Sequence, residues 1–286
     1  MSDWWQQPVY SDTLVHIHIF CDWAPEQLRS LWRPSGLRHT PDQQAAIAAA
    51  WQQATSRPGV NLFDGGLCRL EDFTADAQGA IVGLSPTGYQ AFIGSNCTHP
   101  EWAEIHGHGA LADALGTSVA LLSSDGWAVF GRRGPHLALY PNLPHPVGGT
   151  LEIGDGVTPV DITEELLREV REEVGLDDRD FLDVRILALS EDRRFRQPEM
   201  VWLVQTGRSR AELEQRIARD EHTAAWSIRA DPDVLLAALV PLVDMTGVMR
   251  AVLVSLGWKL GGEAWLKNLR QRLNLEKSSS PRSDST

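Results

Sequence analysis

Three glutamates with helical spacing lie near the middle of the chain. Glu169 and Glu173 are four residues apart and Glu172 lies three after Glu169, so their side chains project from one side of a helix. Like charges at this spacing destabilise an isolated helix by about 0.2–0.5 kcal/mol per pair. A hard cation such as Mg²⁺ or Mn²⁺ would compensate, because it takes oxygen ligands and keeps open positions for water and substrate phosphate. The alternative is a solvated acidic face with Arg168 and Arg171 as partners.

The sequence around these glutamates predicts an amphipathic helix over residues 162–174. Asp161 and Thr163 are candidate N-caps, and Gly175 is a typical residue to follow a helix. Between them, apolar residues recur at helical spacing, at Leu166, Leu167, Val170 and Val174. The helix therefore has one face for a core and another for the carboxylates.

The stretch from Gly148 to Leu176 resembles the Nudix box. The box pattern is Gly, five residues, Glu, seven residues, then Arg-Glu-hydrophobic-x-Glu-Glu-x-Gly-hydrophobic. The second half matches at every fixed position, namely Arg168, Glu169, Val170, Glu172, Glu173, Gly175 and Leu176. The first half departs from the pattern, because Asp155 replaces the Glu and twelve residues separate it from Arg168.

Beyond the box, the chain resembles one subgroup of this superfamily, the animal UDP-glucose/UDP-galactose diphosphatases with their N-terminal domain. That subgroup also has a lengthened box. The resemblance spans about residues 45–225 and rests on Ala48, Trp51, Leu62-Phe63-Asp64, Arg69-Leu70, Gly83-Leu84, Tyr89, Phe92, Gly94, Asn96, Asp113, Leu115-Gly116, Val129-Phe130, Arg132-Arg133 and Gly148-Gly149.

The resemblance implies a metal site for phosphoanhydride hydrolysis. It makes Glu169 and Glu173 the principal Mg²⁺ ligands, Glu172 a ligand or a partner of a second metal, and the Gly149 carbonyl a further donor. It implies that Arg168 orients the glutamates by a bidentate hydrogen-bonded pair.

A carboxylate outside the box completes the site in many members of this superfamily. The matching stretch here is Arg219-Asp220-Glu221-His222. We favour Glu221 as a metal ligand or general base, with Asp220 as the nearby alternative and a solvated loop acid as the other reading.

Candidate substrate contacts lie outside the helix. Arg132 and Arg133 end a strand near Gly149 and could bind a diphosphate, and Arg194 lies on a polar turn that could reach the same place. The alternative for each is an exposed solubility charge. Tyr89 could stack on a uracil, or pack in the core with Phe92.

Composition narrows the classes of partner. The chain has 286 residues, 43% hydrophobic residues and a formal net charge of −12, which argues against a general nucleic-acid or membrane-surface binder. Its three cysteines have no CxxC spacing, and no signal peptide or membrane-spanning run is evident. We therefore expect a cytoplasmic protein that acts on a small nucleoside diphosphate compound. The sequence does not address its oligomeric state.

The remaining chain predicts an α/β (α+β) protein. Strands are expected at residues 13–20, 118–123, 127–133, 185–192, 199–207 and 224–230. Helices are expected from Pro41, at 100–115 with a break near Gly107, at 210–219, at 233–256 and at 263–273. We divide the chain into an N-terminal α+β domain over 1–115, a Nudix-type mixed-sheet α/β/α sandwich over 116–274 and a disordered tail over 275–286.

Three functions remain open at this stage. The first is an Mg²⁺-dependent diphosphatase that converts UDP-glucose or UDP-galactose to UMP and a sugar 1-phosphate. The second is a Nudix pyrophosphatase for ADP-ribose or another nucleoside diphosphate derivative. The third is a nucleotide-sensing Nudix domain without turnover.

Overall fold

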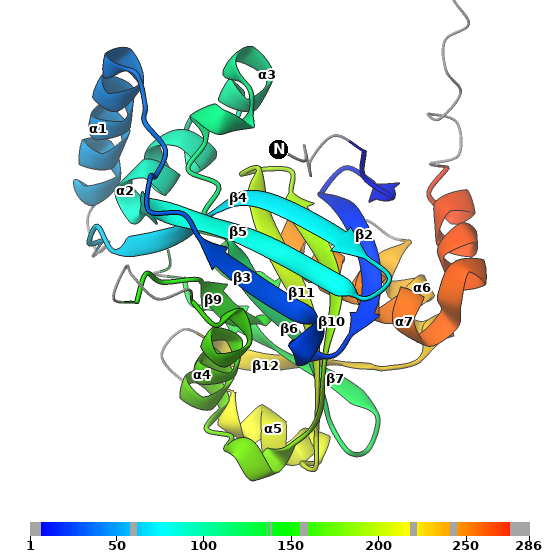
Figure 1. Ribbon diagram of the computed structural model, residues 1–286. Coiled ribbons are helices and arrows are strands. Elements are labelled where there is room, and N and C mark those ends of the chain that lie inside the picture. The colour runs from blue at the N-terminus through cyan, green and yellow to red at the C-terminus, as the bar shows by residue number, and fades with distance from the viewer. Residues whose placement is uncertain are drawn as a thin grey trace, which may run out of the picture.

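A large mixed sheet forms the centre of the computed structural model (Figure 1). The structure describes residues 7–57, 62–135, 137, 139–154, 160–217, 222–240 and 245–274. Within these ranges the sheet has nine strands, and its main path runs β1-β2-β10-β11-β6-β7-β12. Two short strands lie off this path: β8 (Pro144–His145) pairs with β7, and β9 (Val147–Thr150) pairs with β6.

The strands of the main path come from distant parts of the chain. Their bounds are β1 Tyr10–Ser11, β2 Val15–Trp23, β6 Gly116–Leu122, β7 Trp127–Arg133, β10 Phe181–Asp192, β11 Gln197–Thr206 and β12 His222–Arg229. β6 pairs with β7 and β10 pairs with β11, each time as antiparallel strands that are consecutive in the sequence. β11 and β6 run parallel, and this pairing joins the two hairpins.

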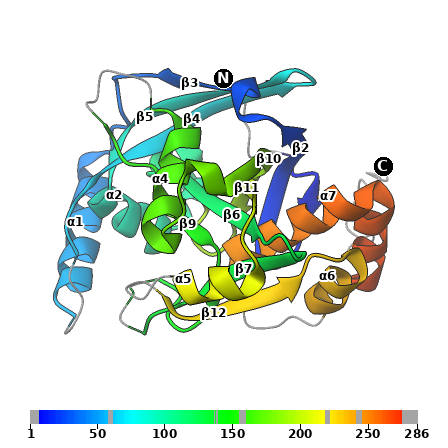
Figure 2. The same cartoon turned by 90° about the horizontal axis from the view of Figure 1, so that it is seen from below.

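Helices cover both faces of the large sheet, and the predicted mixed α/β class is confirmed. Each face of the large sheet packs on its own hydrophobic core. Consecutive residues of β11 point into different cores, because side chains of a strand alternate in direction. Trp202 packs toward α4 (Ile162–Val174) and α5 (Arg210–Arg216), whereas Leu203 packs toward α6 (Pro232–Leu239) and α7 (Gly247–Arg272). Figure 2 shows the strands lying between α4 and α7.

A second sheet of three strands lies over the α4 side of the first sheet (Figure 1). Its order is β3 (Leu28–Trp32), β5 (Gly79–Gly88) and β4 (Gly66–Asp76). Five helical segments that the structure describes lie at one end of this sheet. They are α1 (Pro41–Thr55), α2 (Tyr89–Phe92), η2 (Ile93–Cys97), α3 (Trp102–His106) and η3 (His108–Ala110). Two further short turns are η1 (Pro25–Gln27) and η4 (Asp178–Asp180).

The helix α4 has the bounds and ends that its sequence predicts. The side chain of Asp161 accepts hydrogen bonds from the backbone N–H groups of Thr163 and Glu164, which have no partner inside the helix. Gly175 ends the helix with φ 65°, a left-handed conformation that glycine adopts without a steric penalty. Leu166 and Val170 are fully buried, so the opposite face is left for the charged residues.

The N-terminal part of the chain is not confined to the second sheet. The first 115 residues contribute β3, β4 and β5, but they also contribute β1 and β2, and β2 pairs with β10 in the large sheet. The proposed division at residue 116 coincides with the start of β6. Separate folding of residues 1–115 stays a prediction.

Two other predictions meet the limits of the structure. The helix expected over 233–256 corresponds to α6 and the first part of α7, with residues 241–244 between them outside the described ranges. The expected disordered tail over 275–286 also lies outside them. Within the described residues, no helix combines the length and the apolar character needed to cross a membrane.

Candidate functional site

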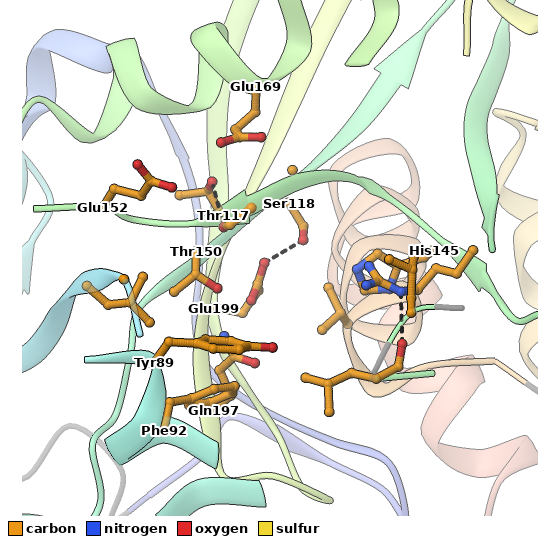
Figure 3. A pocket seen from close by; sticks show the side chains of 18 of the residues that line it. Tyr89, Phe92, Thr117, Ser118, His145, Thr150, Glu152, Glu169, Gln197 and Glu199 are labelled. Atoms are coloured by element: carbon orange, nitrogen blue, oxygen red, sulfur yellow. Dashed lines mark hydrogen bonds between the residues drawn. The ribbon is translucent and has the colours of Figure 1, made fainter. Parts of the chain in front are cut away.

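A cavity of about 500 Å³ opens between the end of the large sheet and the N-terminal part of the chain. Strands β6, β9 and β11 and helix α4 contribute its polar residues, and the segment 62–67 with α2 contributes apolar ones. Figure 3 shows Glu169 and Glu152 at one end, Tyr89 and Phe92 at the other, and Glu199 and Thr150 between them. The cavity therefore has a carboxylate end and an aromatic end.

Glu169 is the α4 carboxylate that lines this cavity. Its carboxylate lies directly against Gly149, where an added Cβ atom would be only 2.9 Å from the Glu169 carboxyl carbon. The Gly149 carbonyl accepts a hydrogen bond of 3.3 Å from Thr117 Oγ1 and keeps a second lone pair. The absence of a side chain at Gly149 thus lets a carboxylate and a backbone oxygen approach the same space.

Arg168 contacts three glutamates of α4, and its predicted orienting role stays a prediction. Its guanidinium donates to Glu169 at 2.7 Å, to Glu172 at 2.8 Å and to Glu165 at 3.0 Å. The side chain of Glu172 is 61% exposed and does not line the cavity. Arg168 therefore reduces the like-charge repulsion on this face. This is what we expect if the face is a solvated acidic surface with arginine partners.

Glu173 is buried and has two protein partners. One oxygen accepts a hydrogen bond from the backbone N–H of Gly148 at 3.0 Å, and the other lies 2.8 Å from Nε2 of His222. The ring of His222 fits against Gly131, where a Cβ atom would lie 2.2 Å from it. Glu173 thus connects α4 to strand β9, at Gly148, and to the first residue of β12.

Glu199 is a buried carboxyl group at the centre of the cavity. Ser118 donates a hydrogen bond to it, and its other oxygen lies over Gly116, where a Cβ atom would be 2.0 Å away. Burial raises the pKa of Glu199 to about 8, although the Ser118 hydrogen bond opposes the shift. Glu199 therefore carries its proton at neutral pH.

The sequence did not point to Glu199 or to His222. The available signal for Glu199 was its position two residues after Gln197 at the start of an apolar strand, which puts two polar side chains on one face of β11. No signal connected His222 to Glu173, because 49 residues separate them and the contact depends on the pairing of β12 with β7.

Tyr89 lies at the aromatic end of the cavity. It contacts Phe92 with ring centroids 6.1 Å apart and Trp51 with centroids 6.2 Å apart in an edge-on arrangement. Phe63, which is 77% exposed, also lines this end. Tyr89 consequently packs with Phe92 and presents a ring to the cavity, so both readings of this residue stand.

The predicted substrate arginines are in different places. Arg133 lines the cavity and donates from Nε to the Leu139 carbonyl at 3.0 Å, whereas Arg132 donates to the Asn142 carbonyl at 2.7 Å and does not line it. Arg194 does not line this cavity either. Its guanidinium lies over the rings of Tyr140 and Phe195, 5.2 and 5.1 Å from their centroids.

Other expected site residues lie outside the described ranges. These are Asp155, Arg219, Asp220 and Glu221. Among the described residues no three His, Cys, Asp or Glu side chains are grouped to hold a metal. The donor chemistry of Glu169 and Gly149 nevertheless fits a hard divalent cation, because both present oxygen atoms at one end of an open cavity.

Comparisons with known proteins give a distant likeness in structure. No family model matches the chain, and no curated protein matches it. The chain is similar to DR0079 from Deinococcus radiodurans, with 20% identity over 49% of this chain and 80% of that one, at a TM-score of 0.38.

A MutT protein from Methanosarcina mazei Go1 is similar over 51% of this chain and 94% of its own length, with 15% identity and a TM-score of 0.34. Each of these two likenesses covers about half of this chain. At such identities and scores, neither structure indicates a substrate.

Proposed function

We propose that the protein is an Mg²⁺-dependent Nudix hydrolase that cleaves the diphosphate of a nucleoside diphosphate derivative. The UDP-glucose and UDP-galactose reaction, which yields UMP and a sugar 1-phosphate, is the form that the subgroup resemblance favours. One observation carries the proposal: α4 holds Glu169 against the Gly149 backbone at one end of a cavity whose other end is aromatic.

The chemistry of a phosphoanhydride explains what such a site needs. Water is a poor nucleophile and the leaving phosphate carries concentrated charge; bound Mg²⁺ lowers the pKa of a coordinated water and neutralises phosphate oxygens. Glu169 and the Gly149 carbonyl would hold the ion, with Glu172, Glu173 and Glu221 as the further ligands that the resemblance implies.

The described residues have separate parts in this proposal. Arg168 orients Glu169, and the Glu173 carboxylate fixes the Gly148-Gly149 segment of β9 that supplies the backbone oxygen. Arg133 provides positive charge for the diphosphate, and Tyr89 offers a face on which a base can stack.

Phosphorus NMR over a substrate panel with Mg²⁺ tests the proposal. The panel contains UDP-glucose, UDP-galactose, ADP-ribose, a dinucleotide and a CoA-type diphosphate. We expect UMP and sugar 1-phosphate from the UDP-sugars. Faster cleavage of ADP-ribose or of the dinucleotide would reject the sugar-nucleotide assignment and keep the reaction class.

We expect Glu169→Gln to lower turnover by about a hundredfold or more, because the change removes a metal-binding charge and keeps the size of the side chain. Glu164→Gln is the matched control, since Glu164 lies on the same helix and pairs with Arg171 at 2.7 Å. Equal turnover of both variants would show that the Glu169 carboxylate has no part in the reaction.

A second candidate is a nucleotide-sensing domain without turnover. The observation that favours it is that both oxygens of Glu173 already contact protein groups, Gly148 N–H and His222. Binding of a panel compound without cleavage of any of them would support this candidate and reject the hydrolase.

A further inference from the structure

Glu199 occupies an unusual position for a carboxyl group. It is 5% exposed, and its partner within the described ranges is the Ser118 hydroxyl, with no ion pair to arginine or lysine. An uncompensated buried carboxylate is costly, so a group in this position keeps its proton. Because a carboxyl group here adds nothing to the apolar core, its presence suggests a part in ligand binding.

The backbone around Glu199 makes room for it. Gly116 is its cross-strand neighbour in the parallel pair of β11 and β6, and any larger residue there would overlap the carboxyl group. Ser118, two residues along the same strand, holds the other oxygen. The glycine, the serine and the glutamate thus form a built feature that lines the cavity.

The charge of the cavity explains why a neutral carboxyl group is needed. The lining residues that the structure describes include one arginine, Arg133, and three carboxyl groups, Glu152, Glu169 and Glu199. His145 adds no charge at neutral pH, because burial holds its pKa well below its usual range. An ionised Glu199 would repel a diphosphate at short range, whereas a protonated one can donate a hydrogen bond to it.

We propose that Glu199 binds the ligand in its neutral form and donates a hydrogen bond from its carboxyl group to an anionic oxygen of a nucleoside diphosphate. This inference rests on the proposed nucleotide ligand, but not on its hydrolysis. Glu199 is thus a binding residue between the carboxylate end and the aromatic end of the cavity (Figure 3).

The inference makes ligand affinity depend on pH. The folded pKa of Glu199 is about 8, so the donor is present at pH 7 and is mostly lost at pH 9. The charged or titratable groups around it are Asp192 on β10, Glu169 on α4, His145 on β8, Arg133 at the end of β7 and Glu152 after β9. Of these groups, Asp192 adds to the rise in the pKa of Glu199 that burial causes.

The test is calorimetric titration of the full chain with uridine 5′-(α,β-methylene)diphosphate and Mg²⁺ at pH 6 to 9, since the P–C–P bridge resists cleavage. For the unsubstituted protein we expect Kd to rise about tenfold between pH 7 and pH 9, as ionisation near pH 8 removes the donor. Glu199→Gln keeps a neutral donor at every pH, so its Kd should lack this rise.

Two controls separate this effect from others. Glu152→Gln removes an exposed carboxylate from the same cavity and should keep the pH dependence of the unsubstituted protein. The ionisation of the ligand is common to all variants, so the ratio of their Kd values isolates the protein group. Carbon-13 NMR of the glutamate carboxyl groups, with the Glu199 signal assigned by its loss in Glu199→Gln, follows the titration directly.

Parallel pH dependence of Kd in the unsubstituted protein and in Glu199→Gln would overturn the inference. So would ionisation of the Glu199 signal below pH 6, or failure of both proteins to bind the nucleotide at any pH. Binding with the expected pH dependence but without cleavage of any panel compound would reject the hydrolase and leave this inference standing.

Discussion

Glu169 and Glu173 come from the same helix, yet their surroundings give them different work. Glu169 lies at the cavity beside Gly149, while Glu173 is buried between the Gly148 N–H and His222. His222 has an Nδ1 atom without a hydrogen-bond partner among the described residues, so Glu173 is what orients its ring. In the proposed hydrolase, His222 is therefore a positioning residue that acts through Glu173.

The contact between His222 and Glu173 gives a prediction at the scale of one residue. We expect His222→Asn to lower turnover about 10- to 100-fold, as the loss of a group that orients a metal-site residue does. The decrease should be in kcat more than in KM, because His222 does not line the cavity.

Steady-state kinetics with the substrate identified by the panel measures this effect. His106→Asn is the control, since His106 is exposed on α3 and lies away from Glu173. Unfolding in urea shows whether the variant is folded under the assay conditions. A folded His222→Asn with unchanged kcat would mean that Glu173 needs no partner on β12.

At the scale of elements, strand β9 decides where the backbone oxygen of Gly149 lies. Gly148 has φ 142°, a backbone conformation that residues other than glycine rarely adopt. It pairs with Ser118 on β6. A Cβ atom at Gly148 would lie 2.0 Å from the Thr117 carbonyl oxygen. This glycine is therefore required by both conformation and space.

We expect Gly148→Ala to destabilise the protein by more than about 1 kcal/mol and to lower turnover, because strand β9 must move away from Thr117. Gly154→Ala is the matched control, since no atom lies within 4 Å of a Cβ there. Urea unfolding of the two variants measures the difference. Equal free energies of unfolding would show that strand β9 accommodates the added Cβ atom without loss of stability.

Local elements could be predicted from sequence because their signals are local. Asp161 and Gly175 mark the ends of α4, and alternation marks β2 through the buried Val15 and Ile17. The parallel pairing of β6 with β11 and the place of β2 beside β10 could not be predicted, because they depend on contacts between distant segments. Glu199 was missed for the same reason, since its role follows from Gly116 and Ser118 on β6.

At the scale of the whole molecule, buried ionisable groups set how stability changes with pH. Burial raises the pKa of Glu191 to about 7 and that of Glu199 to about 8, so the folded state keeps protons that the unfolded state releases above about pH 4.5. Burial lowers the pKa of His16 to about 4 and that of His18 to about 3. The two kinds of group therefore act in opposite directions.

The sign follows from which state binds more protons. The histidines favour the folded state above their unfolded pKa of 6.5, and that contribution is lost as pH falls below it. The two glutamates favour the folded state below about pH 4.5, and their contribution is lost as pH rises toward 7 and 8. Above pH 7 the histidines are mostly neutral in both states, so of these four groups the two glutamates dominate the change between pH 7 and 8.

We expect the free energy of unfolding to fall as pH rises from 7 to 8. Each glutamate contributes about 1.4 kcal/mol per pH unit where it is protonated in the folded state alone. Glu199→Gln should reduce the slope, most clearly between pH 7 and 8. Urea unfolding at closely spaced pH values measures it, and a flat or rising curve in this range would contradict the assignment of neutral Glu199 and Glu191.

The place of β2 in the large sheet has a consequence for how the protein is made. Residues 15–23 leave the ribosome early, but their neighbour in the sheet, Phe181–Asp192, is synthesised much later. Until then, the apolar Val15 and Ile17 have no native strand beside them on that side, and such an edge pairs readily with other chains. The large sheet is thus completed late in synthesis. Until then, the unpaired edge of residues 15–23 is a segment that a chaperone can bind.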